Sequence, residues 1–222
     1  MLPIGVEDVL RARSCAMLDV QPARRMLQLA LLVVIFGMSY GAVMGSFGGV
    51  FGERFWQVFY SAVKVPLLLM GTGALSLPSF FVVNTLFGLR CDFSYSLRAL
   101  AATQAALTII LASFAPFTVL WYVSFANYRG AILFNALMFG GASFAAQWVL
   151  RRFYRPLIKR DTRHRVLLRI WLVIYAFVGI QMAWVLRPFV GSPGIATQFF
   201  RQDAWGNAYV RLAEIIWLFF TR

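Results

Sequence analysis

Hydrophobic positions along the chain fall into five long runs that are separated by short polar segments. The runs cover Met26–Val50, Val65–Gly88, Leu97–Tyr122, Gly130–Leu150 and Leu167–Val190. A helix needs about 20 apolar residues to cross the ~30 Å hydrocarbon core of a bilayer, and every run is long enough. The pattern therefore predicts an all-α polytopic transmembrane helical bundle, with five spans in a single membrane domain, 1–222.

The two ends of the chain have a mixed pattern instead of a continuous apolar one. In the N-terminal segment, 1–25, residues 6–17 place apolar side chains at helical spacing with charged ones opposite. This favours an amphipathic helix on the cytoplasmic membrane surface. In the outer segment and C-terminal helix, 191–222, the stretch Ala204–Arg222 is short for a span and contains Glu214. A second amphipathic surface helix is therefore favoured there, with a sixth span as the alternative.

Positive charge concentrates in the segment 151–165, RRFYRPLIKRDTRHR, which holds seven Lys or Arg residues and one acid. Short loops this rich in Lys and Arg stay on the cytoplasmic side of a membrane. With this segment inside, fourteen cations lie on the inner side and three, Arg54, Lys64 and Arg129, on the outer side before the fifth span ends. We therefore expect a basic cytoplasmic loop at 151–165, interrupted by Pro156, and a cytoplasmic N-terminus.

The overall composition agrees with a membrane protein. The chain of 222 residues is 61% hydrophobic and 13% charged, whereas soluble domains are close to half apolar and a quarter charged. Its formal net charge of +13 lies mainly at span ends, where it would meet anionic lipid, so nucleic acid is not an expected partner. Cys15 and Cys91 both fall on the inner side, where thiols stay reduced. With one histidine besides, we expect no metal and no cofactor.

Glycines form a stripe along the first span. Gly37, Gly41, Gly45 and Gly49 recur at intervals of four and so lie on one face of a helix. Small residues let another helix backbone approach closely, which is how helices associate in lipid. The stripe predicts a packing surface. Its partner is expected to be another span of this chain, with a second copy of the chain as the alternative.

The fourth span carries a second, weaker stripe of small and polar residues. Ala136, Gly140, Ser143 and Gln147 are spaced four, three and four apart, which keeps them on one helix face. Bulky phenylalanines beside it limit its width. This face is expected to pack against protein and not against lipid.

Polar side chains within the spans are few. They are the amides Asn84, Gln104, Asn135, Gln147 and Gln181. Hydrogen bonds between helices are the favoured interpretation, and a polar path for a substrate is the alternative. No acidic residue lies deep inside a span, which makes a proton- or cation-coupled transporter less favoured.

The string Gly37-Met-Ser39-Tyr-Gly41 matches the nucleophile elbow GxSxG. That motif needs a sharp strand-to-helix turn that exposes the serine, whereas these glycines belong to a helical stripe. The only histidine, His164, falls in the basic segment and is expected to be a solvated loop residue. We therefore expect helix packing at Ser39, no catalytic residue, and a protein that is not an enzyme.

Two cations mark the outer ends of spans. Lys64 and Arg187 each lie beside a proline turn and could hold a lipid phosphate or an acidic partner. Ordinary snorkelling to the headgroups is the favoured alternative. Beyond Arg187, residues 190–203 are too irregular to cross lipid. We expect them to pack over the outer mouth of the bundle, with Arg187 bonded to backbone carbonyls or lipid phosphate.

Several strings resemble an uncharacterised family of bacterial multi-pass membrane proteins that is loosely similar to the Yip-type five-span proteins. They are KVPLLL from Lys64, LPSFF from Leu77, NTLFG from Asn84 and QMAWVLRPFVGSP from Gln181. The resemblance covers all five spans and the outer segment through Arg201. It implies a five-span bundle in a bacterial inner membrane, and it implies no activity or catalytic residue.

Three classes of function follow from these features. A non-catalytic scaffold, assembly factor or subunit of a membrane complex fits the packing stripes and the absence of recognisable chemistry. An oligomeric transporter or channel is the alternative, and an intramembrane enzyme is the least favoured. Expected partners are membrane lipids, anionic ones at the cytoplasmic face, and other membrane subunits or further copies of the chain.

Overall fold

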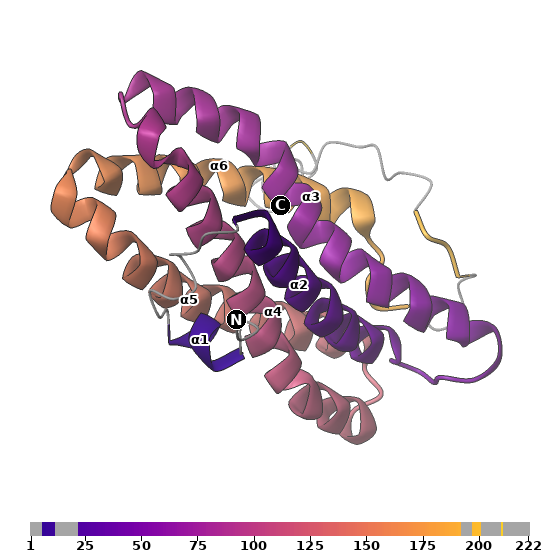
Figure 1. Ribbon diagram of the computed structural model, residues 1–222. Helices are drawn as coiled ribbons and strands as arrows, with labels where there is room; N and C mark the ends of the chain where they lie inside the picture. The colour runs from indigo at the N-terminus through magenta and orange to yellow at the C-terminus, as the bar shows by residue number, and fades with distance from the viewer. Residues whose placement is uncertain (1–5, 12–21, 192–196, 201–209, 211–222) are drawn as a thin grey trace, which may run out of the picture.

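A computed structural model describes residues 6–11, 22–191, 197–200 and 210, and every regular element in these residues is helical. Figure 1 shows the arrangement. A short helix α1 (Val6–Leu10) precedes five long ones, α2 (Pro22–Gly45), α3 (Phe55–Leu86), α4 (Phe93–Ser124), α5 (Tyr128–Arg160) and α6 (Arg163–Leu186), with 3-10 turns η2 (Gly52–Arg54) and η3 (Arg90–Asp92). The five long helices are long and apolar enough to cross a membrane, which confirms the predicted all-α bundle. The expected C-terminal helix lies outside the described residues.

Helix α2 lies between α3 and α4. It packs against α3 on one side and α4 on another, while α5 packs on α4 and α6 packs on α3. Alanines on α4, such as Ala99, Ala102 and Ala105, are fully buried, so neighbouring helices can approach closely there. Helices α5 and α6 share a turn and then diverge, so each rests on a different partner (Figure 1).

The glycine stripe of α2 meets α3. A Cβ atom at Gly41 would lie 2.9 Å from the Cα of Ala62, and one at Gly45 would lie 2.8 Å from the Cα of Val58. Gly37 lies against the ring of Pro66, 3.2 Å from its Cγ. These contacts bring two backbones together where any side chain would separate them.

The fourth glycine of the stripe has another role. Gly49 follows the end of α2 and has a φ of +126°, a conformation that L side chains rarely adopt. It belongs to the turn that leads to α3, and only the Cδ of Arg54 comes near the position of a Cβ, at 3.9 Å. The prediction that Gly49 continues the packing stripe is therefore wrong.

The second predicted stripe, on α5, is also placed differently. Ala136 and Gly140 are exposed, and nothing lies within 4 Å of a Cβ built on Gly140. Ser143 and Gln147 are half-buried. The buried face of α5 is the adjacent one, with alanines and Leu150 among its members. The expectation that Ala136 and Gly140 pack against protein is wrong, because α4 covers a neighbouring face of the same helix.

Two long helices extend further than their apolar patterns predicted. Helix α5 continues to Arg160 with Pro156 inside it, so 151–165 is mostly helix with a turn at 161–162, and not a loop. Proline removes one hydrogen bond from a helix, and this close to a helix end water can replace it. Helix α3 begins at Phe55 because the 3-10 turn of η2 leads directly into its aromatic first turns.

Turns that were predicted on one side of the membrane lie together. Arg160 of the α5–α6 turn contacts Asp92 in η3, with its Nη1 3.2 Å from the carboxylate. At the other end, the ring of Phe47 lies 6.1 Å from that of Tyr128 at the start of α5. The loops therefore sort into two groups at opposite ends of the bundle, as the alternating span order requires. Which end faces the cytoplasm stays a prediction from charge.

Candidate functional site

A cleft of about 630 Å³ opens between the diverging α5 and α6 near the α4–α5 end of the bundle. Its lining residues come from α2, α3, α5, α6 and the segment after α6, and most are apolar. They are Met44, Leu68, Tyr128, Ile132, Asn135, Ala136, Phe139, Ala183, Arg187, Pro188, Phe189 and Val190. Cavities of about 300–1,000 Å³ with a few polar groups are typical of small-molecule sites.

One wall of the cleft contains a buried hydrogen-bond network around Asn135. The Tyr40 hydroxyl of α2 donates to Asn135 Oδ1 at 3.0 Å, and Asn135 Nδ2 donates to the Tyr122 hydroxyl of α4 at 2.6 Å. Tyr122 in turn donates to the carbonyl of Met44 at 3.2 Å. The network joins α2, α4 and α5, so Asn135 forms the hydrogen bonds between helices that were predicted for the span amides.

The end of the cleft near the α4–α5 turn is formed by residues 188–191, which we call the outer strap after the orientation predicted from charge. Three side chains of α3 hold its carbonyls. Lys64 Nζ donates to Pro188 O at 2.8 Å, Gln57 Nε2 donates to Phe189 O at 3.2 Å, and Ser61 Oγ donates to the same oxygen. The Tyr128 hydroxyl reaches Val190 O at 3.4 Å. An irregular backbone at a span end is thereby satisfied by protein groups.

The two cations predicted at the outer interface behave differently from each other. Lys64 is fully buried. Its Nζ donates to the strap carbonyl of Pro188 and lies 4.9 Å from the ring centroid of Phe199. A lysine that snorkels extends its ammonium group to the headgroups, whereas the ammonium group of Lys64 is enclosed by protein. Arg187 lies in the cleft wall, with its guanidinium 3.1 Å from the ring centroid of Trp184. Lys64 makes a contact with a backbone carbonyl, that of Pro188, of the kind that was expected of Arg187.

Sequence reasoning missed Gln57 and Ser61 as strap ligands. Both precede the apolar run Val65–Gly88 from which the second span was predicted. Gln57, Ser61 and Lys64 follow one another at intervals of four and three residues, a spacing that could have identified one polar helix face. Gly191 completes the site, because a Cβ there would lie 2.7 Å from Gln57 Cγ.

At the opposite end of the bundle, Asp92 joins η3 to the α5–α6 turn and the start of α6. Its carboxylate lies 3.2 Å from Arg160 Nη1 and 3.2 Å from His164 Nε2. His164 is fully buried, whereas Arg160 is exposed. The prediction of a solvated loop histidine is wrong, because α6 already begins at Arg163 and turns His164 towards η3.

Several polar groups near this end are buried with no protein hydrogen-bond partner among the described residues. They include both amide atoms of Asn84, the hydroxyls of Ser96 and Tyr154, and His164 Nδ1. Buried groups of this kind are normally satisfied by internal water. Further into the bundle, Gln104 Nε2 does link helices, donating to Leu69 O at 3.1 Å and to the Tyr175 hydroxyl at 3.2 Å.

The GxSxG string has no elbow geometry. Ser39 lies within α2, is exposed, and donates its hydroxyl to the carbonyl of Ile35 at 2.8 Å, four residues earlier. This is the ordinary bond of a serine inside a helix. In the part of the chain that the structure describes, no group of three or more His, Cys, Asp or Glu side chains could hold a metal ion. Cys91 is exposed, and Cys15 lies outside the described residues.

The chemistry available at the cleft is binding. Its walls consist of apolar surface, the guanidinium of Arg187 against the ring of Trp184, and the hydrogen-bond network around Asn135. Comparison of the chain with protein-family models, with curated proteins and with solved structures finds no match.

Proposed function

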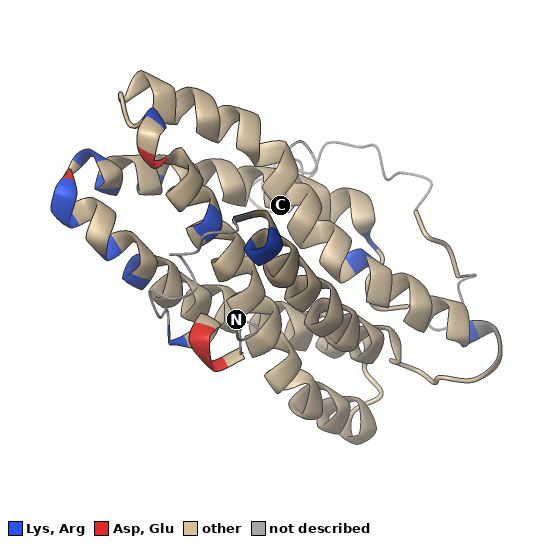
Figure 2. Ribbon diagram, in the orientation of Figure 1, with Lys and Arg blue, Asp and Glu red and all other residues tan. Residues whose placement is uncertain are grey.

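We propose that the protein is a non-catalytic integral membrane component that acts as a scaffold, assembly factor or subunit of a membrane complex. In this proposal it lies in a bacterial inner membrane with its N-terminus in the cytoplasm. The observation that carries it is the projecting basic end of the α5–α6 hairpin, which we call the basic hairpin end, residues 151–165. Figure 2 shows Lys and Arg gathered there.

The length of α5 supports a projection beyond the bilayer. Between Arg129 and Arg151 the helix carries no charge and rises about 33 Å at 1.5 Å per residue, close to the ~30 Å hydrocarbon core. The residues 151–160 then add about 15 Å of helix. The headgroup layer is only about 5–8 Å deep on each side, so for a helix along the membrane normal the last turns reach the aqueous phase.

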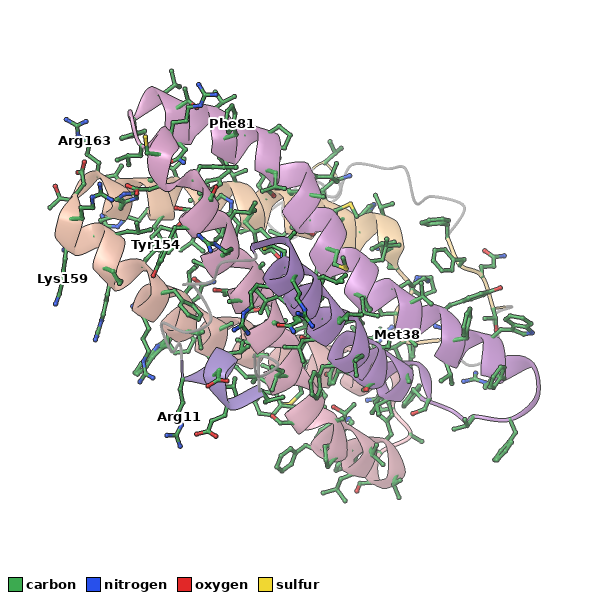
Figure 3. All side chains as sticks on the ribbon, viewed as in Figure 1. Arg11, Met38, Phe81, Tyr154, Lys159 and Arg163 are labelled. Carbon is green, nitrogen blue, oxygen red and sulfur yellow. The ribbon has the colours of Figure 1, made fainter. Side chains whose placement is uncertain are left out.

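The basic hairpin end is exposed, and contacts with η3 and α4 fix its position. Its seven Lys and Arg side chains are all exposed, and Lys159 and Arg163 point away from the bundle in Figure 3. The turn is fixed to η3 through Asp92, and Tyr95 donates to Phe153 O at 3.3 Å. A preorganised cationic surface recognises acidic surfaces through complementary charge. Its reach past the headgroups favours an acidic protein partner over lipid alone.

The test is co-purification from the native membrane in mild detergent, followed by mass measurement. We expect a discrete complex with a second protein that survives with the double variant Arg151→Gln, Arg152→Gln and is lost with Arg155→Gln, Lys159→Gln. Both pairs are exposed on α5, and both remove two charges. The first pair lies at the start of the headgroup layer, whereas the second lies about 6 Å and about 12 Å further along the helix, so that Lys159 is past the headgroups.

Two results would count against this function. Isolation of the wild-type chain alone, at 25.1 kDa plus detergent, would exclude a stable complex. A ring of identical chains would instead favour the transporter or channel alternative.

A further inference from the structure

The cleft between α5 and α6 lies at the depth of a single membrane leaflet. Its residues on α5 run from Tyr128 to Phe139, which is about 16 Å of helix at 1.5 Å per residue. This is half of the ~30 Å hydrocarbon core. Because Arg129 marks one end of the uncharged part of α5, the cleft occupies the leaflet on the side of the α4–α5 turn. That leaflet is the outer one in the orientation predicted from charge.

The polarity of the cleft changes along its length. Towards the middle of the bundle it is lined by Leu68, Phe139 and Ala183, which are apolar. Asn135, in the same region, uses its amide within the protein and does not require a polar ligand. At the outer end lies Arg187, the charged member among the described lining residues. An apolar body with a cationic end matches an amphipathic anion.

The volume distinguishes a lipid chain from a protein helix. A helix with side chains has a diameter of at least about 10 Å, so filling 16 Å of its length would need roughly 1,200 Å³. The cleft offers about 630 Å³, which suits a ligand of small-molecule size. The cleft opens between two spans that diverge, so a molecule dissolved in the bilayer can enter sideways.

We infer that the cleft binds one phospholipid of this leaflet, with one acyl chain between α5 and α6 and the phosphate at Arg187. Arginine binds phosphate through its planar fork of donors. The ring of Trp184 under the guanidinium keeps that fork on the cleft side of α6. This inference does not depend on the proposed scaffold role, because it concerns the opposite end of the molecule from the basic hairpin end.

The first experiment blocks the cleft. Ala136→Phe places a ring into the cleft from an exposed lining position, and Leu137→Phe, on the adjacent lipid-facing position of α5, is the matched control. The purified proteins are titrated in mild detergent with phosphatidylglycerol and measured by native mass spectrometry. We expect one phospholipid bound to the wild type and to Leu137→Phe, and at least tenfold weaker retention by Ala136→Phe. Equal retention by all three would overturn the inference.

The second experiment tests the phosphate contact. Wild type and Arg187→Gln are compared with phosphatidylglycerol and with diacylglycerol of the same chains. We expect Arg187→Gln to retain phosphatidylglycerol at least fivefold less and diacylglycerol unchanged, and we expect inorganic phosphate to compete weakly. Equal retention of diacylglycerol and phosphatidylglycerol by the wild type would overturn the headgroup assignment. If Arg187→Gln does not fold, the comparison of the two lipids on wild type and Ala136→Phe still decides.

Discussion

Replacing Gly41 by alanine tests the contact between α2 and α3 with the smallest possible perturbation. The added Cβ would lie 2.9 Å from the Cα of Ala62 and would also meet the carbonyl oxygen of Ser61. Both neighbours are backbone atoms, so no side chain can rotate away. The matched control is Gly140→Ala on α5, where nothing lies within 4 Å of the new atom.

The expected magnitude follows from two opposing effects. Alanine is favoured over glycine in a helix by about 1 kcal/mol, and both variants gain this. At Gly41 the two backbones must also separate by about 0.5 Å to restore an ordinary contact of 3.4 Å with the Cα of Ala62, and by more to clear the carbonyl oxygen of Ser61. Overpacking of this kind typically costs about 1–3 kcal/mol. Gly140→Ala should therefore be neutral or slightly stabilised, and Gly41→Ala should fall about 1–3 kcal/mol below it.

Thermal unfolding in mild detergent measures the difference, with the monodisperse fraction after heating read by size-exclusion chromatography. We expect the midpoint of Gly41→Ala to lie several degrees below that of Gly140→Ala. The larger change Gly45→Leu should reduce folded protein further, because leucine would enter the same backbone contact. Coinciding midpoints for the two alanine variants would refute the packing argument, since the steric environment is the only intended difference between them.

Two further predictions concern orientation and the polar network. A cysteine at Thr162, in the exposed α5–α6 turn, should react with a membrane-impermeant reagent only after the inner membrane is opened, with the exposed Cys91 removed by Cys91→Ser; labelling in intact cells would contradict the orientation. Asn135→Ala should destabilise the protein by about 0.6–2 kcal/mol, because it leaves the Tyr40 hydroxyl buried without its acceptor. A double-mutant cycle with Tyr40→Phe measures their coupling, and additive effects would show that the bond contributes nothing.

Span number and relative sidedness were predictable from the sequence for a local reason. An uncharged run of about twenty residues must satisfy its backbone internally in lipid, whichever helices surround it. The helix ends were less predictable. The first turns of α3 and the last turns of α5 contain aromatic and charged residues. Both also contact segments far apart in the chain: Gln57 of α3 bonds to Phe189, and Arg160 of α5 pairs with Asp92.

The sequence by itself determined that α2 carries a helix-packing face, but only the tertiary structure decided which small-residue stripe is used. Gly41 and Gly140 each belong to a stripe of small residues at helical spacing; a Cβ on the first would touch a backbone, and one on the second would face open space. Periodicity defines the face of a helix, and the position of its neighbours determines whether that face is covered. The same reason separates Lys64 from Arg187: both were predicted at span ends, yet the packing of the outer strap on α3 buries the lysine and leaves the arginine in the cleft wall.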